Sequence, residues 1–282
     1  MVSIQEIDAI NSVLLNSCSN VVKKGGFILD SIKHRIVNHE KNLHIIFCNF
    51  VTISAQDNPQ IIRANYFEAK SGHSAKLEKG LKDHTDKFHQ TLDHAVNTWQ
   101  VIAGDRTGQF VRTTYPQGWA DFDAYQDLPG DPSHWDRSVS PHLEGTAGNV
   151  FWKFDAELSY NPPQSPPKMI AFWKVQYKAG QWKKHRDALL KVRQAQEENN
   201  SKSRIMVYAK AIGGEGRIYA MGLALDGWTD LNPEAMSLFE MLEASFGAGA
   251  GSEVLQARSA AVEKYESEVL LFRADLSTPL SD

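Results

Sequence analysis

Apolar and polar side chains alternate along residues 61–70 and 169–178, as in strands that bury one face of a sheet. In the second stretch the apolar parity consists of Ala171, Trp173, Val175 and Tyr177. The opposite parity mixes aromatic and polar side chains, namely Phe172, Lys174, Gln176 and Lys178. The first stretch is arranged alike, with a mixed face of Tyr66, Glu68 and Lys70. We expect each apolar face to contact helices and each mixed face to point away from them.

A helical pattern and a β-hairpin follow each of these strands. In the range 73–98, apolar residues recur at steps of four or seven at Leu77, Leu81, Phe88, Leu92 and Val96, and 181–198 is also amphipathic. The expected hairpins join 99–103 to 110–115 and 204–212 to 217–225 through glycine turns. Last strands are expected at 150–158 and 268–276. The order βαββαβ in both halves predicts an α+β protein of two tandem ferredoxin-like units, each an antiparallel sheet with helices on one face.

Matching motifs occur in the same order in the two halves. Gly118-Trp119-Ala120-Asp121-Phe122 corresponds to Gly227-Trp228-Thr229-Asp230-Leu231, and the ranges 70–72 and 154–159 correspond to 178–180 and 272–277. We interpret the matches as an internal duplication. Trp119 and Trp228 are expected in the core, as tryptophans usually are. Asp121 and Asp230 are expected to cap helices.

The matches divide the chain into four segments. Residues 58–160 form the first unit and 168–282 the second, and the proline-rich segment 161–167 is expected to be a stiff linker. The remaining segment, 1–57, has helical patterns followed by an apolar run at 43–53 between Lys41 and the small polar residues at 54–56. That layout is typical of a secretory signal, although about forty residues precede it. The alternatives are a buried strand or helix.

Composition excludes several classes of protein. The chain carries a formal net charge of −4, which gives no electrostatic basis for binding nucleic acid or anionic membranes. No apolar run is long enough to span a bilayer. Both cysteines precede residue 58, so the two units have neither disulfides nor a thiolate metal site. We expect a periplasmic or secreted protein if 41–56 is a signal segment, and a cytoplasmic one otherwise.

The histidines of the first unit do not predict a metal site. His73, His84, His89 and His94 fall within the predicted helix 73–98, where steps of five residues lie about 140° apart around the axis. They cannot all face one metal ion, so a solvated polar face is expected. In the second unit, His185 lies one helical turn from Trp182 and from Leu189, and is the candidate for acid–base catalysis.

A strand ending in Lys-x-Gly, a long charged helix, a glycine-turned hairpin and a Trp-x-Asp helix entry together resemble the dimeric α/β-barrel superfamily. That group includes antibiotic-biosynthesis monooxygenase-like, stress-responsive barrel and chlorite-dismutase-like families. The resemblance covers about 58–160 and 168–277. It implies that the two sheets close around a shared lumen, here within one chain, with the mixed strand faces lining it. Self-association is a further possibility that the resemblance leaves open.

The resemblance leads to two hypotheses for function. The first is a cofactor-independent, monooxygenase-like enzyme that oxidises an aromatic or quinoid substrate. For it, Tyr66, Lys174, Gln176, Tyr208 and Tyr219 are the expected substrate-binding residues, and His185 is the catalytic candidate. The second is a non-catalytic protein that binds a small organic ligand or acts in a stress response. A haem-binding barrel is a further alternative, which would need an axial histidine such as His185.

Overall fold

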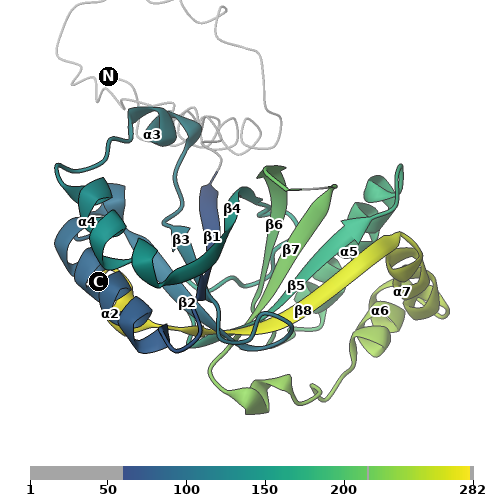
Figure 1. Cartoon of the computed structure of the whole chain (residues 1–282). Coiled ribbons are helices and arrows are strands. Elements are labelled where there is room, and N and C mark those ends of the chain that lie inside the picture. The colour runs from purple at the N-terminus through teal and green to yellow at the C-terminus, as the bar shows by residue number, and fades with distance from the viewer. Residues whose placement is uncertain (1–59, 215, 280–282) are drawn as a thin grey trace, which may run out of the picture. The chain divides into compact units, whose positions relative to one another are not determined.

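The computed structural model describes residues 60–214 and 216–279, which form a closed eight-stranded antiparallel barrel (Figure 1). The signal segment predicted at 41–56 lies outside the described residues. The strands of the first half are β1 (Ile61–Ala69), β2 (Val96–Ala103), β3 (Phe110–Thr114) and β4 (Leu143–Phe154). Those of the second half are β5 (Met169–Tyr177), β6 (Ile205–Ile212), β7 (Ile218–Leu225) and β8 (Val262–Phe272).

The order of the strands shows two ferredoxin-like sheets that join at both edges. Around the barrel the strands follow the order β1-β3-β2-β8-β5-β7-β6-β4, and β4 returns to β1. Within each half, the strands therefore lie side by side in the order fourth, first, third, second. The junctions β2–β8 and β4–β6 each join the second strand of one half to the fourth strand of the other. The predicted fold is thus confirmed, and it closes as an intramolecular barrel.

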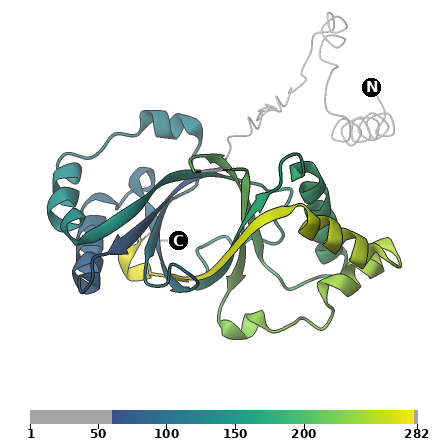
Figure 2. The ribbon, with the colours of Figure 1, turned by 45° about the vertical axis from the view of Figure 1, so that its right-hand side comes forward.

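Helices cover the outer side of the barrel, on opposite flanks for the two halves (Figure 2). In the first half they are α2 (Ser74–Phe88), α3 (Trp119–Ala124) and α4 (Asp131–Ser138), with short 3-10 turns at Leu92–His94 and Ser140–His142. In the second half they are α5 (Trp182–Glu198), α6 (Leu238–Phe246) and α7 (Ala250–Ala260), with 3-10 turns at Trp228–Leu231 and Ala274–Leu276. Among the described residues, none of the helices combines the length and apolar character needed to cross a membrane.

The alternating strands bury their faces as the sequence predicts. Val175 and Tyr177 of β5 pack against Leu189 of α5 on the outer side of the sheet. Leu77 and Leu81 of α2 pack in the same way against the first sheet, with Phe67 and Phe110. The opposite parity of β5 points into the barrel, where Phe172 and Lys174 line a cavity. Period-two patterning therefore places one face of each strand under helices and the other inside the barrel.

Three local predictions differ from the structure. The helix predicted over 73–98 ends at Phe88, and Val96 already begins β2. Leu92 fits the helical pattern but is 64% exposed, so its periodicity does not reflect burial. The last strand of each half begins earlier than predicted, because exposed polar residues at its start mask the strand pattern. It also ends earlier, at Phe154 in the first half and at Phe272 in the second.

The repeated Trp-x-Asp motif marks a helix start but not a core position. Trp119 is 38% exposed and Trp228 is 55% exposed, so the prediction that both are core residues is wrong. The aspartates do cap, because Asp121 Oδ2 accepts a hydrogen bond from the Gly118 amide at 2.7 Å and Asp230 accepts one from the Gly227 amide at 3.3 Å. The motif therefore fixes the turn after the hairpin through its carboxylate.

Candidate functional site

The barrel encloses a cavity of about 440 Å³. Every strand contributes to its wall through the parity that faces inward, and the proline-rich segment 163–167 contributes as well. The apolar and aromatic side chains that the strands contribute to this wall are Ile62, Ala64, Trp99, Val111, Val150, Trp152, Ile170, Phe172, Met206, Tyr208, Ile218, Ala220 and Leu270. A largely apolar cavity of this size is typical of sites for small organic molecules.

A hydrogen-bonded cluster of polar side chains forms one part of the cavity wall. The Tyr66 hydroxyl donates to Glu268 Oε1 at 2.8 Å, and Arg106 Nε donates to Glu268 Oε2 at 3.1 Å. Arg106 also forms an ion pair with this carboxylate, and its guanidinium lies 3.9 Å from the centre of the Tyr66 ring. The Glu268 side chain is only 3% exposed. Tyr66, from the first half, and Glu268, from the second, are therefore held together inside the barrel.

Lys174 adds a second cation beside this cluster. Its ammonium group lies 5.5 Å from the centre of the Tyr66 ring and 3.0 Å from Glu266 Oε2. Burial, and then the charge of Arg106, lower the pKa of Lys174 below its usual range. Burial, and then the Glu268 carboxylate, raise the pKa of the Tyr66 hydroxyl, so the phenol stays protonated. The cluster thus combines two cations, each paired with a carboxylate, with a neutral hydroxyl.

A second cavity, of about 350 Å³, lies on the outer side of the first sheet. Helices α2 and α4 contribute His84, Asp131 and Trp135 to its wall, and the outward-facing positions of β1 and β3 contribute Arg63 and Arg112. Unlike the lumen, its lining is rich in titratable groups. The remaining ones are His89, Tyr125 and Asp127.

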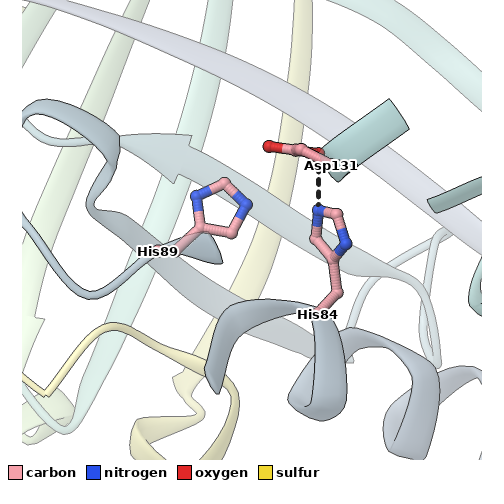
Figure 3. Close-up of side chains that lie close together, drawn as sticks. All are labelled: His84, His89 and Asp131. Atoms are coloured by element: carbon pink, nitrogen blue, oxygen red, sulfur yellow. Dashed lines mark ion pairs between the residues drawn. The ribbon is translucent and has the colours of Figure 1, made fainter. Parts of the chain in front are cut away.

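Within this cavity, His84, His89 and Asp131 bring donor atoms to within 4.8 Å of one another (Figure 3). All three residues are buried, with exposed fractions of 2%, 8% and 8%. Burial, and then the charge of Arg112, lower the pKa of His84 to about 3 and that of His89 to about 4. Both imidazoles are therefore neutral near pH 7.

The expectation of a solvated histidine face is wrong for His84 and His89. Because α2 ends at Phe88, His89 no longer follows helical geometry, and its ring turns toward the ring of His84 at a centroid distance of 5.1 Å. His94 lies on a separate 3-10 turn, where its carbonyl accepts a hydrogen bond from His89. The angular argument that separated these residues therefore applies only as far as the helix extends.

A close helix contact positions His84 opposite Asp131. Gly80 of α2 lies against the carboxyl end of α4, and a Cβ at Gly80 would come within 2.1 Å of the Ser138 carbonyl oxygen. Only glycine allows the two helices to approach this closely.

We expect Gly80→Ala to destabilise the protein by about 1–3 kcal/mol, because the helices must separate to admit the methyl group. Chemical denaturation measures this change. Gly145→Ala on β4 is the matched control, since nothing lies within 4 Å of its added Cβ. Equal stability of the two variants would contradict the contact.

No family model matches the sequence, and no curated protein matches it in sequence. Solved structures do match the coordinates. A predicted monooxygenase from Lactobacillus acidophilus NCFM shares 7% identity, with a TM-score of 0.50 and coverage of 78% of this chain and 96% of that one. Together with the closed barrel of two ferredoxin-like sheets, this match decides the fold. The chain has the dimeric α/β-barrel fold.

Two further structures match over similar shares of the chain. An anthrone oxidase-like protein has 12% identity and a TM-score of 0.48, covering 78% of this chain and 94% of that chain. A chlorite dismutase variant from Candidatus Nitrospira defluvii has 7% identity and a TM-score of 0.46, covering 78% and 93%.

The dimeric α/β-barrel fold places the predicted substrate-binding residues in different environments. Tyr66, Lys174 and Tyr208 line the lumen. Gln176 lies farther along β5 beside the Gly216 turn, where a Cβ on Gly216 would be 2.9 Å from its amide nitrogen. Tyr219 points to the outer side of the sheet, and its hydroxyl accepts a hydrogen bond from Arg186 at 3.2 Å. The structure thus brings three of the five together.

His185 lies outside the barrel, between α5 and the sheet. It is fully buried and packs on the Tyr177 ring at a centroid distance of 4.9 Å. Its Nδ1 lies 3.2 Å from the Arg258 carbonyl oxygen, and burial lowers its pKa to about 4. The side chain lines neither the lumen nor the outer cavity. Since neither cavity reaches His185, it does not fit the role of an axial haem ligand in them.

Sequence reasoning missed Arg106 and Glu268, which complete the polar cluster of the lumen. Arg106 lies in the turn between β2 and β3, and its partner Glu268 is 162 residues away in the chain. The sequence did contain one signal for this pair. Glu268 lies on the face of β8 that points into the barrel, and a carboxylate at such a position needs a cation as its partner. That inference requires knowing that β2 and β8 are neighbours, which only the barrel closure supplies.

Proposed function

We propose that the protein binds a small aromatic phenol or quinone in the lumen of the barrel. The observation that carries the proposal is the cavity of about 440 Å³ inside the barrel, whose apolar and aromatic walls meet cationic groups at Lys174 and Arg106. Apolar walls favour a ring system, and a few converging polar groups fix its orientation. The ring would lie among Trp99, Trp152 and Phe172.

The ligand's oxygen would lie at the polar cluster. Lys174 can donate a hydrogen bond to a quinone carbonyl or to a phenolate, whereas the proton of the Tyr66 hydroxyl is already donated to Glu268. Within a buried site, a nearby ammonium group stabilises an oxyanion more strongly than the same group does in water. Glu266 and Glu268 hold the two cations in place, because they pair with Lys174 and Arg106 respectively.

The same arrangement suits oxidation of a phenol by molecular oxygen without a cofactor. The name of the Lactobacillus acidophilus protein, a monooxygenase, is in line with an oxidation but specifies neither the substrate nor a cofactor. A bound phenolate is more electron-rich than the phenol and reacts more readily with dioxygen. In a balanced reaction, a ring carbon bearing hydrogen becomes a carbonyl, one oxygen atom enters the quinone, and the other leaves as water. Lys174 would hold the phenolate oxygen, and the apolar walls would exclude solvent.

Replacing Lys174 with methionine is expected to weaken binding of 1-naphthol and 1,4-naphthoquinone by about 10- to 150-fold, since one charge-assisted hydrogen bond contributes about 1.5–3 kcal/mol. Quenching of tryptophan fluorescence measures the affinity, because Trp99 and Trp152 line the cavity. Lys183→Met on the exposed face of α5 is the control and should bind as the unchanged protein does. Equal affinities for the two variants would refute the lumen as the site.

Oxygen uptake distinguishes an enzyme from a binding protein. With 1-naphthol bound, consumption of one dioxygen per quinone formed supports the oxidative reaction. Saturable binding without oxygen uptake supports the non-catalytic alternative. Tyr208→Phe alters a residue of the cavity wall, whereas Tyr219→Phe alters the outer side of the same sheet, so only the former should change either measurement.

A further inference from the structure

The outer cavity beneath α2 and α4 holds chemistry that the lumen proposal does not use. Two neutral histidines and a carboxylate converge there, from the end of α2 and the start of α4 (Figure 3). A buried cluster of this composition requires a partner for each donor and acceptor. The hydrogen bonds around the rings show which nitrogens are already used.

The hydrogen bonds leave the Nε2 atom of each histidine directed at the cluster. His89 Nδ1 lies 2.5 Å from the His94 carbonyl oxygen, which can only accept, so Nδ1 carries the proton and Nε2 keeps its lone pair. His84 Nδ1 lies 3.2 Å from His134 Nδ1, and its Nε2 lies 3.3 Å from Asp131 Oδ1. A backbone carbonyl that fixes the second ring nitrogen, as at His89, is a usual support of a metal-binding histidine.

We propose that His84 Nε2, His89 Nε2 and Asp131 Oδ1 bind a divalent transition-metal ion. Two ligand atoms at about 2.1 Å from a tetrahedral zinc ion lie about 3.4 Å apart, which the His84–Asp131 separation of 3.3 Å already matches. Two histidines and one carboxylate on one side of an ion also form the ligand set of non-haem Fe²⁺ sites. The remaining coordination positions would face the cavity of about 350 Å³.

Arg112 indicates what would occupy those open positions. The residue is 6% exposed and lines the cavity; one of its terminal nitrogens donates to Thr85 Oγ1 at 2.8 Å, while its buried Nε has no hydrogen-bond partner. Its positive charge opposes binding of a bare cation. A small oxyanion that coordinates the metal and accepts from the guanidinium would satisfy both groups. The site is therefore inferred to hold a metal ion together with an oxyanion such as a carboxylate.

Titration with Zn²⁺ by calorimetry, and with Co²⁺ by its visible absorption, tests this assignment on the full chain. We expect one ion per chain, bound at least 100-fold more weakly by His89→Gln and by Asp131→Asn. Asp131→Asn keeps the shape of the side chain and one acceptor oxygen, so circular dichroism and the Tm in chelator should show that it folds. Acetate should change the spectrum of bound Co²⁺, and this change should be lost in Arg112→Lys.

His142→Gln is the matched control, because His142 pairs with His73 in a second histidine contact, with Nδ1 atoms 3.2 Å apart. This variant should bind the metal as the unchanged protein does. Loss of binding in His142→Gln, full binding in Asp131→Asn, or no binding of either ion to the unchanged protein would overturn the proposal. These results do not depend on lumen binding, since Lys174→Met leaves all three ligands intact.

Discussion

Replacing Glu268 with alanine is expected to destabilise the protein by about 3–5 kcal/mol, the usual cost of removing one partner of a buried ion pair. The substitution leaves Arg106 without its carboxylate and the Tyr66 hydroxyl without its acceptor. Both groups lie in the wall of the lumen, where few other polar groups can replace the lost partner. Because the three residues come from both halves, the change also weakens the contact between the two sheets.

Denaturation with urea, followed by circular dichroism, measures this effect. Glu157→Ala is the control, since Glu157 pairs with Arg186 on the surface with 76% of its side chain exposed, and exposed pairs contribute about 0–1 kcal/mol. Glu268→Gln should fall between the two variants, because the amide still accepts from Tyr66 but carries no charge. A loss below about 1 kcal/mol for Glu268→Ala would show that the cluster does not contribute to stability.

Acidification is expected to destabilise the protein below about pH 6.5, with the largest loss reached near pH 4. Burial lowers the pKa of His185 from about 6.5 to about 4, so the folded state favours the neutral ring. The resulting stability is fully present above the unfolded pKa and is lost as the pH falls through the folded pKa. Each such histidine contributes about 1.4 kcal/mol per pH unit within this window. His84 and His89 have the same direction of shift.

Urea denaturation at several pH values between 4.5 and 7.5, in the presence of a chelator, tests this dependence. His185→Leu removes one titrating group from the interior, so its stability should fall less steeply below pH 6.5 than that of the unchanged protein. The difference between the two slopes should approach the contribution of one histidine. Parallel curves for the two proteins would mean that His185 titrates alike in the folded and unfolded states.

The fold could be predicted because strand parity depends on local sequence alone. The apolar face of β5, from Ala171 to Tyr177, identifies both its helix-facing side and its inward side. The end of α2 could not be predicted in the same way, because Leu92 continues the apolar spacing although it is exposed. A common origin of the two halves remains a prediction from their matching motifs.

The candidate sites depend on contacts that local sequence does not specify. Lys174 could be placed in the lumen by parity, but its neighbour Arg106 comes from the other half of the chain. His84 and Asp131 are separated by 47 positions and meet because Gly80 lets α2 and α4 approach each other. The histidines of the proposed metal site were therefore excluded at the sequence level by an angle that holds only inside a helix, and Asp131 was not considered.

The pairing of β2 with β8 and of β4 with β6 has a consequence for dissecting the molecule. Either half produced alone would present two bare strand edges and the apolar lining of half a lumen to water, a combination that promotes aggregation. If the chain is cut between residues 161 and 167 and the two fragments are mixed, each fragment should supply the strands that pair with the free edges of the other. The lumen is thus a shared property of both halves, and neither fragment encloses it without the other.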